Sequence, residues 1–230
     1  KNFIKNINNH VMIIKEEEPW LLWPNEVSYG LNKGDIMDTF EGEDFTISMH
    51  LKILTKTPHK RTIFAKLPNY MGIDIEKENN NLLFILNLTQ NGEEKWEFLF
   101  SDLTLGYDVN FLTLYYKKET KKVELYINDS LAIEYTLKQD EEFTKGNEPH
   151  VIFGAGNFPH NGFNLNYCSY DLDYLIIAKK CVSLSDIKGL YNGEIQSVDG
   201  VVGLYDFTKK TDYKIYDLTG NCNFIHKILN

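Results

Sequence analysis

Side chains alternate strictly between apolar and polar along residues 45–53, which read Phe-Thr-Ile-Ser-Met-His-Leu-Lys-Ile. A period of two is that of a β-strand, in which successive side chains point to opposite faces of a sheet. The apolar set that begins with Phe45 is expected to face a core, and the set that contains Thr46, Ser48 and His50 is expected to face solvent. The segment therefore predicts a half-buried sheet, and it makes His50 a surface histidine.

Many further short segments have strand character and are separated by turn sequences such as Asn91-Gly92 and Asn128-Asp129. Asn-Gly between two apolar runs is typical of a β-hairpin. Many short strands with little helical periodicity predict a sandwich or a barrel. The expected strands are 62–66, 71–76, 82–89, 95–100, 111–116, 123–127, 132–136 and 150–154.

Residues 172–191 predict a buried strand that runs into one short helix near residues 184–191. Ser183 lies at the N-cap position and Asp186 follows three residues later, which approximates a capping box. Ile187, Leu190 and Tyr191 recur at the spacing of one helical face. This is the single helix that the sequence predicts with both a start signal and an apolar face.

The chain of 230 residues, 43% of them hydrophobic, is long enough for one large all-β domain or two small ones. We expect a single sandwich over residues 1–230. The polar residues 193–200 separate a last segment from the helix. Residues 201–230 therefore either complete this sandwich or open a neighbouring module.

Charge and composition exclude several partners. The net charge of −9 argues against nucleic acid, because binding phosphates requires a basic face. The lysines at 117, 118, 121 and 122 flank a predicted turn and are expected to be solvated. No stretch approaches the roughly 18 apolar residues that span a bilayer, so no membrane insertion is expected. The three cysteines have no CxxC spacing, which predicts free thiols and no zinc site.

Several segments together resemble the concanavalin A-like superfamily, and specifically its laminin G-like jelly-roll modules. The matching segments are 45–51, 123–131, 150–155, 172–191, 204–207 and 217–221, in that order. The resemblance implies an all-β, two-sheet antiparallel jelly-roll sandwich that binds carbohydrate or protein. It implies Asp173 as a structural hydrogen-bonding residue, and it favours an extracellular or cell-surface location.

Two stretches carry the aromatic rings and amides that sugar binding requires. The first holds Trp20 and Trp23, for which the alternative is packing in the core or against a neighbouring module. The second is a loop rich in Gly, Pro and Asn, for which the alternative is an ordinary connection. Its candidate ligand-binding residues are Phe158, His160, Asn161, Phe163 and Asn164.

An acidic segment precedes residue 45, and its Asp35, Asp38 and Glu41 form a candidate calcium site. The alternative is a solvated acidic loop. No other cofactor is expected. A retaining glycosidase needs two carboxyl groups about 5 Å apart, and no motif that would supply them is evident.

These observations predict a non-catalytic carbohydrate-binding module, with a glycan or polysaccharide as partner, within a larger polysaccharide-active or surface protein. One alternative is a structural or protein-recognition module that packs against an adjacent domain. A divergent glycoside hydrolase or lyase is the other.

Overall fold

The fold was analysed in a computed structural model of the chain. The structure describes residues 13–14, 20–22, 42–54, 61–67, 71–78, 81–88, 97–105, 109–139, 150–154, 168, 170–206, 214–220 and 225–227.

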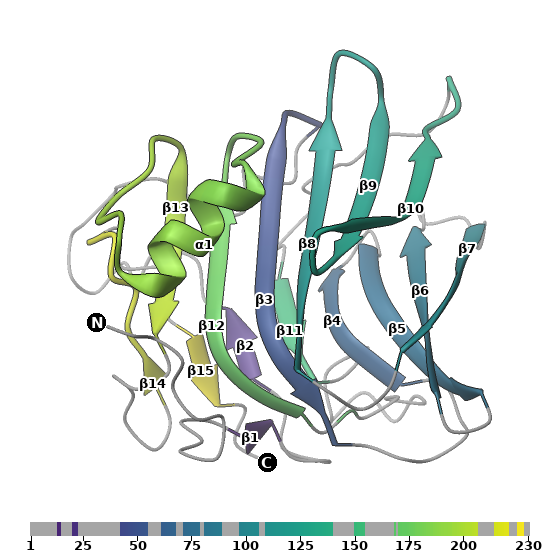
Figure 1. The fold of residues 1–230 in the computed structure, drawn as a ribbon, viewed down its shortest axis with the longest axis horizontal. Coiled ribbons are helices and arrows are strands. Elements are labelled where there is room, and N and C mark those ends of the chain that lie inside the picture. The colour runs from purple at the N-terminus through teal and green to yellow at the C-terminus, as the bar shows by residue number, and fades with distance from the viewer. Residues whose placement is uncertain are drawn as a thin grey trace.

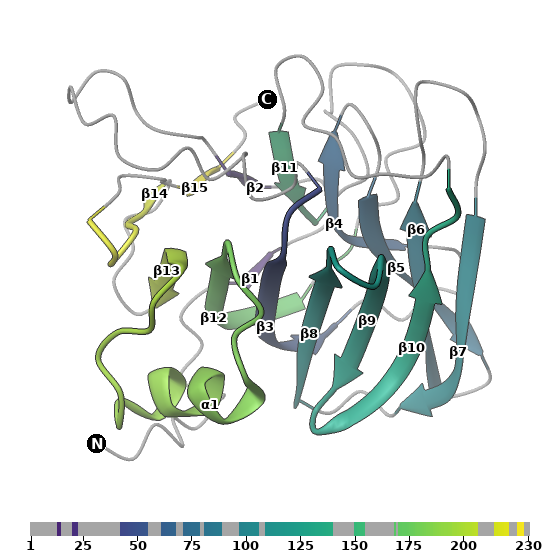
Figure 2. The same ribbon diagram turned by 90° about the horizontal axis from the view of Figure 1, so that it is seen from above.

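The described strands form two antiparallel sheets that face one another, with one helix outside the first sheet (Figures 1 and 2). The first sheet has the order β1 (Ile13–Ile14), β12 (Tyr170–Ala178), β3 (Phe45–Ile53), β8 (Val109–Lys117), β9 (Lys122–Ile127) and β10 (Ser130–Thr136), and β13 (Val201–Asp206) also pairs with β12. The second sheet has the order β14 (Lys214–Ile215), β15 (Ile225–Lys227), β2 (Trp20–Leu22), β11 (His150–Phe153), β4 (Arg61–Leu67), β5 (Met71–Glu78), β6 (Asn81–Leu88) and β7 (Glu97–Leu105). The predicted all-β, two-sheet antiparallel sandwich with one short helix is confirmed.

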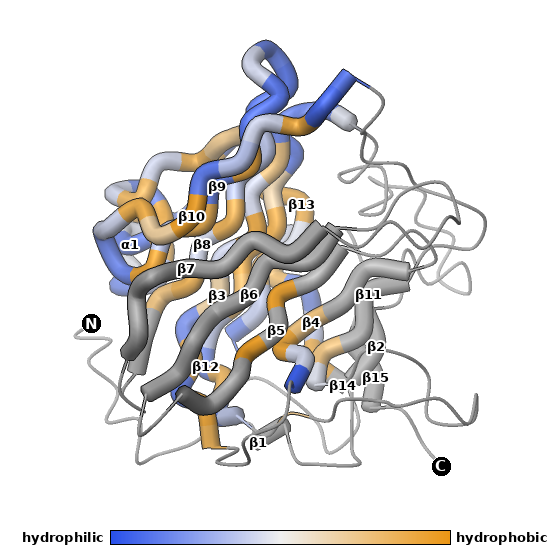
Figure 3. Tube along the Cα trace, turned by 90° about the vertical axis from the view of Figure 1, so that its right-hand side faces the viewer, coloured by the Kyte–Doolittle hydropathy of each residue, from blue (hydrophilic) through white to orange (hydrophobic). Residues whose placement is uncertain are grey.

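The main core lies between the two sheets and takes residues from both. Figure 3 shows apolar stretches, in orange, along β3 of the first sheet and β5 of the second. Phe45, Ile47 and Met49 of β3 are at most 1% exposed, as their alternation predicted. Ile63 and Phe153 enter the same core from the second sheet. Each fully buried side chain of this size contributes about 1.5–3 kcal/mol to folding, so period-two burial is the main source of stability.

The other face of β3 does not face solvent, and the prediction that it would is wrong. Thr46 is 0% exposed and Ser48 is 2% exposed. A second, smaller apolar cluster on this face includes Tyr174 and Ile176 of β12 and Leu190 of the helix. The helix lies across the outer face of the first sheet, as Figure 2 shows. Thr46 hydrogen-bonds to Lys180 and Val182 in the connection that leads into the helix, and Ser48 hydrogen-bonds to Thr113.

Helix α1 (Leu184–Asn192) begins where the Ser183 cap predicted and ends one residue beyond the predicted range of 184–191. The Ser183 hydroxyl accepts a hydrogen bond of 3.1 Å from the Asp186 N–H, which satisfies one unpaired donor of the first turn. Gly193 ends the helix with φ = 74°, a left-handed conformation that glycine adopts without steric cost. Ile187, Leu190 and Tyr191 are buried and hold α1 to the sheet.

Residues 216–220 form a turn against the edge of β13. The Asp217 carboxylate accepts hydrogen bonds from the backbone N–H of Leu204 at 3.1 Å and of Thr219 at 3.0 Å. The Leu218 N–H donates to the Leu204 carbonyl at 2.8 Å. The turn thus satisfies the polar groups of a strand edge that would otherwise be open to pairing. No helix in the described part of the chain is long and apolar enough to cross a membrane.

Candidate functional site

Most of the predicted ligand-binding residues lie outside the described part of the chain: Trp23, Phe158, His160, Asn161, Phe163 and Asn164. Trp20 is described as the first residue of β2, by its backbone alone. The structure does describe the residues on both sides of the 155–167 segment, which contains five of the predicted residues. These flanking residues show where the segment joins the sandwich.

Trp20 of the first predicted stretch lies beside Phe153, which shortly precedes the second predicted stretch, in the interior of the second sheet. Trp20 is the register partner of Phe153, and Gly154 follows directly as the last described residue before the 155–167 segment. The sequence gives no sign of this proximity, because positions 20 and 153 are brought together only by the pairing of β2 with β11. Trp20 and Phe153 are therefore neighbours on adjacent strands, and the 155–167 segment follows Phe153 by two positions in the sequence.

A set of buried hydrogen bonds fixes both ends of the 155–167 segment. The Ile63 carbonyl accepts a hydrogen bond from the Gly154 N–H at 2.9 Å and another from the Tyr170 hydroxyl at 2.7 Å. The Cys168 N–H donates to the Gly154 carbonyl at 3.0 Å. Gly154 has φ = 88°, which favours glycine at this position. Sequence reasoning missed Ile63 and Tyr170, because neither carries a motif.

Two residues that follow the 155–167 segment are fully buried. Cys168 and Tyr170 are both 0% exposed. Burial, with a smaller contribution from Cys168, raises the pKa of Tyr170 well above its ordinary value, so its hydroxyl remains a donor to Ile63. We call Trp20, Ile63, Phe153, Gly154 and Tyr170 the recognition edge. It offers a rigid mount for a segment that carries rings and amides.

His50 is not the surface histidine that the sequence predicted. Its side chain is 11% exposed, and its Nδ1 lies 2.7 Å from Oδ1 of Asp173. The other Asp173 oxygen accepts a hydrogen bond of 3.0 Å from the Tyr191 hydroxyl on α1. The imidazole also contacts the rings of Phe111 and Tyr191, with centroids 4.2 and 4.7 Å away.

A β-bulge places Asp173 in this cluster. The register of β12 against β3 shifts between Leu172 and Tyr174, so Asp173 is the extra residue of the bulge. Burial first, and then the neighbouring Asp173, raises the pKa of Tyr191, which keeps its hydroxyl protonated. The network joins strand to helix, and Asp173 has the structural hydrogen-bonding role that the resemblance implied.

The lysines of the predicted hairpin tip contact carboxylates or a backbone carbonyl. Lys117 lies 2.5 Å from Glu124, and Lys122 lies 2.9 Å from Glu134. Lys118 forms an ion pair with Glu43. The Lys121 ammonium donates to the Lys138 carbonyl at 2.9 Å.

The acidic segment before β3 is described only at its end. Asp35, Asp38 and Glu41 lie outside the described residues, so the calcium site stays a prediction. Glu43 pairs with Lys118, and Asp44 accepts the Lys118 backbone N–H at 2.8 Å, so both serve the β8–β9 turn. Across the residues that the structure describes, no group of three metal-ligating side chains occurs.

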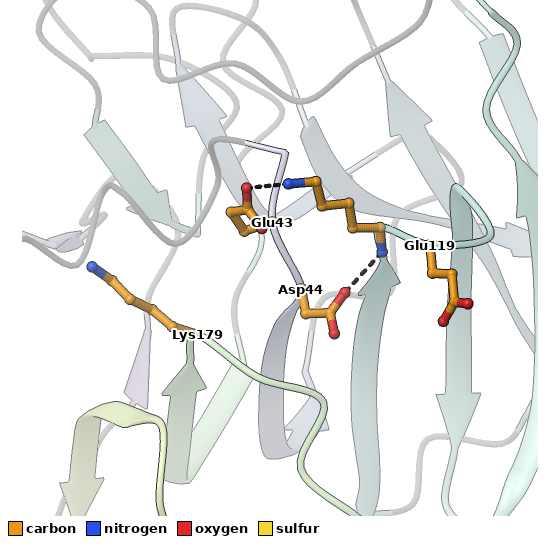
Figure 4. A pocket seen from close by; sticks show the side chains of 5 residues that line it. Glu43, Asp44, Glu119 and Lys179 are labelled. Carbon is orange, nitrogen blue, oxygen red and sulfur yellow. Dashed lines mark hydrogen bonds and ion pairs between the residues drawn. The ribbon is translucent and has the colours of Figure 1, made fainter.

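An open depression of about 560 Å³ lies at this same rim (Figure 4). Glu43, Asp44, Lys118, Glu119 and Lys179 line it. It lies at the opposite end of β12 from the recognition edge, because Tyr170 begins that strand and Lys179 follows its last residue. The depression and the residues that flank the 155–167 segment thus lie at different ends of the sandwich.

Solved structures with the same fold include proteins that bind carbohydrate. A candidate carbohydrate-binding protein from Bacteroides ovatus superposes with a TM-score of 0.62 and 13% identity over 91% of this chain and 57% of that protein. The CBM40 module of a Ruminococcus gnavus IT-sialidase, bound to α2,3-sialyllactose, gives a TM-score of 0.54 and 14% identity over 80% of this chain and 99% of the module. The heptameric SAP-like pentraxin of Limulus polyphemus gives 0.51 and 8% identity over 93% and 95% of the two chains.

At these identities the likeness shows a shared lectin-like β-sandwich fold. The chain spans a little over half the length of the Bacteroides protein. No curated protein matches the sequence. The sequence pattern of the family described as Clostridium neurotoxin, N-terminal receptor binding, matches residues 3–151. Because this match covers more than half of the chain, the protein belongs to the Clostridium neurotoxin N-terminal receptor-binding family.

Proposed function

We propose that this chain is a non-catalytic carbohydrate-binding module of a larger polysaccharide-active or surface protein. In this proposal a glycan binds at the recognition edge. The observation that supports the proposal is the pairing of Trp20 with Phe153, because Trp20 belongs to one predicted ligand-binding stretch and Phe153 shortly precedes the other in the sequence. We further propose that the sandwich is of the concanavalin A-like, laminin G-like type.

The rigidity of the edge supports this proposal. A loop whose attachment points are fixed before binding loses less conformational entropy when the ligand arrives. The hydrogen bonds that Gly154 and Tyr170 donate to the Ile63 carbonyl hold these two flanking residues in place. In the proposed complex Phe158 and Phe163 stack on sugar rings, while Asn161 and Asn164 hydrogen-bond to hydroxyl groups.

The comparisons supply independent support. The family is described as receptor binding, and glycans are one chemical class of receptor. The Ruminococcus module was solved with a bound sialyllactose, and the shared fold spans 99% of that module. A sandwich of this shape can therefore present a glycan site without a further domain. Which sugar this chain binds is left to experiment.

One observation favours a second function, protein recognition. Tyr216 is 44% exposed and Leu218 is 42% exposed, on a turn whose backbone Asp217 holds rigid. Partner proteins commonly contact apolar and aromatic side chains that a rigid turn holds in place. In this alternative the turn packs against an adjacent domain or a protein receptor.

A glycan array probed with the labelled chain tests the proposal and separates the two functions. We expect a defined set of glycan hits that persists in the Tyr216→Ala/Leu218→Ala variant. An array without hits would overturn the carbohydrate proposal. Hits that disappear in that variant would move the glycan from the recognition edge to the 216–220 turn, which would also contradict it.

A further inference from the structure

The depression at the β8–β9 turn is built from three segments that are far apart in the sequence. Glu43 and Asp44 precede β3, Lys118 and Glu119 belong to the β8–β9 turn, and Lys179 follows β12. In Figure 4, Lys179 and Glu119 lie on opposite sides of Asp44. Its volume of about 560 Å³ is in the range of roughly 300–1,000 Å³ that small-ligand sites occupy.

Backbone hydrogen bonds fix the Lys179 side of the depression. The Lys179 N–H donates to the Gly200 carbonyl at 2.8 Å. The Thr46 hydroxyl donates to the Lys180 carbonyl at 2.6 Å and accepts from the Val182 N–H at 2.9 Å. These bonds hold the connection between β12 and α1 against the start of β3.

The side formed by the β8–β9 turn is fixed as well. Asp44 accepts the Lys118 backbone N–H at 2.8 Å, and the Lys121 N–H closes the turn on the Lys118 carbonyl at 3.2 Å. The backbone around the depression is therefore held in place before any ligand arrives.

The ion pair in the depression is exposed to solvent. The Lys118 side chain is 56% exposed and the Glu43 side chain is 64% exposed. Exposed ion pairs of this kind contribute little to folding stability, so their polar atoms remain accessible to a ligand. Stability alone does not account for five charged side chains around one depression.

The mixture of charges selects the chemistry of the ligand. Three carboxylates repel an anion, and two ammonium groups repel a cation. A hydroxyl group can bind to both kinds of side chain, because it donates to a carboxylate and accepts from an ammonium. We propose that this depression is a second subsite that takes an uncharged, hydroxyl-rich sugar unit. This inference deepens the proposed carbohydrate-binding function and rests on it.

The subsite is independent of the recognition edge. The two lie at opposite ends of β12, whose nine residues span roughly 25–30 Å at about 3.3 Å per residue. Separate variants can therefore inactivate them one at a time. The Glu119→Gln/Lys179→Met variant changes the subsite and leaves the Asp44–Lys118 contact that holds the turn. Glu194→Gln/Lys138→Met, at exposed positions elsewhere, is the charge-matched control.

The test is an NMR titration of the ¹⁵N-labelled chain with neutral methyl hexosides, with N-acetylneuraminic acid and glucosamine as charged comparisons. We expect neutral hexosides to shift the amide signals of Asp44, Glu119 and Lys179, with an affinity that changes less than about twofold in 0.15 M salt. The subsite variant should weaken this binding at least about tenfold, and the control variant should not.

Two results would overturn the subsite. The first is hexoside binding that shifts only signals outside the depression, which leaves the proposed function intact. The second is a response only to a charged sugar that 0.15 M salt abolishes. If no sugar shifts any signal and the glycan array is also empty, both the subsite and the proposed function fail together.

Discussion

His50 on β3 and Asp173 on β12 lie 2.7 Å apart beneath helix α1, and the same carboxylate accepts the Tyr191 hydroxyl of that helix. One aspartate thus joins two strands and the helix. The β-bulge at Leu172–Tyr174 makes this contact possible, because it turns Asp173 toward the helix together with Tyr174. The network holds α1 over the outer face of the first sheet.

Replacing Asp173 by alanine is expected to destabilise the fold by about 1–3 kcal/mol, because two partly buried partners lose their acceptor. The measurement is the free energy of unfolding from urea denaturation. Asp199→Ala is the matched control, since that side chain is 93% exposed and lies 3.4 Å from Lys180. Equal stabilities of the two variants would show that the network does not hold the helix.

Thr46→Val tests the covering of the outer face. Thr46 is fully buried, and its hydroxyl donates to the Lys180 carbonyl and accepts from the Val182 N–H. Valine has no hydroxyl, so both backbone groups lose this partner. We expect a loss of about 1–3 kcal/mol in the free energy of unfolding. Thr136→Val, at an exposed position on β10, should change it by less than about 0.5 kcal/mol. A Thr46→Val protein as stable as wild type would contradict the described contacts.

The buried tyrosines predict loss of stability at alkaline pH. Burial raises the pKa of Tyr170 and Tyr205 well above the ordinary value of 10.0. The folded state then keeps protons that the unfolded state releases, so this contribution is complete below about pH 10 and is lost as the pH rises further. Circular dichroism and tyrosinate absorbance, followed together, should change in one transition. Complete tyrosinate formation in a protein with native dichroism would refute this.

Cys181 should be a slow nucleophile. Burial first, and then the nearby Asp44, raises the pKa of its thiol from 9.0 to about 11, which leaves roughly 100-fold less thiolate at pH 8. Its thiol also donates to the Tyr116 carbonyl at 3.4 Å. Iodoacetamide labelling at pH 8, localised by peptide mapping, should reach Cys181 far more slowly in the folded chain than in urea. Equal rates would show that the thiol is not protected.

The sequence predicted the strands well because their signal is local. The alternation from Phe45 to Ile53 and the Ser183 cap are each contained within a few residues, and the structure reproduces both. The solvent-facing side of β3 was predicted wrongly for a physical reason. Polar Thr46 and Ser48 carry no mark that a helix more than 130 positions later will cover them.

The candidate site was predictable only as separate pieces. Trp20 and the 155–167 segment could be chosen by residue type, but only the pairing of β2 with β11 brings Trp20 beside Phe153. The Ile63 carbonyl is a backbone group. No pattern of side chains in the sequence predicts that it accepts hydrogen bonds from Gly154 and Tyr170. His50 was expected at the surface but belongs to a partly buried network. The reason is again a contact between residues that are far apart in the sequence.

Glycan binding at the recognition edge is tested most directly by titration calorimetry with a glycan identified on the array. The wild-type chain is compared with Phe158→Ala/Phe163→Ala, and Tyr216→Ala serves as an aromatic control at an exposed position. We expect the double variant to bind at least about tenfold more weakly while unfolding at the same urea concentration, and the control to bind like wild type. Equal affinity of the double variant and the wild type would contradict the proposed site.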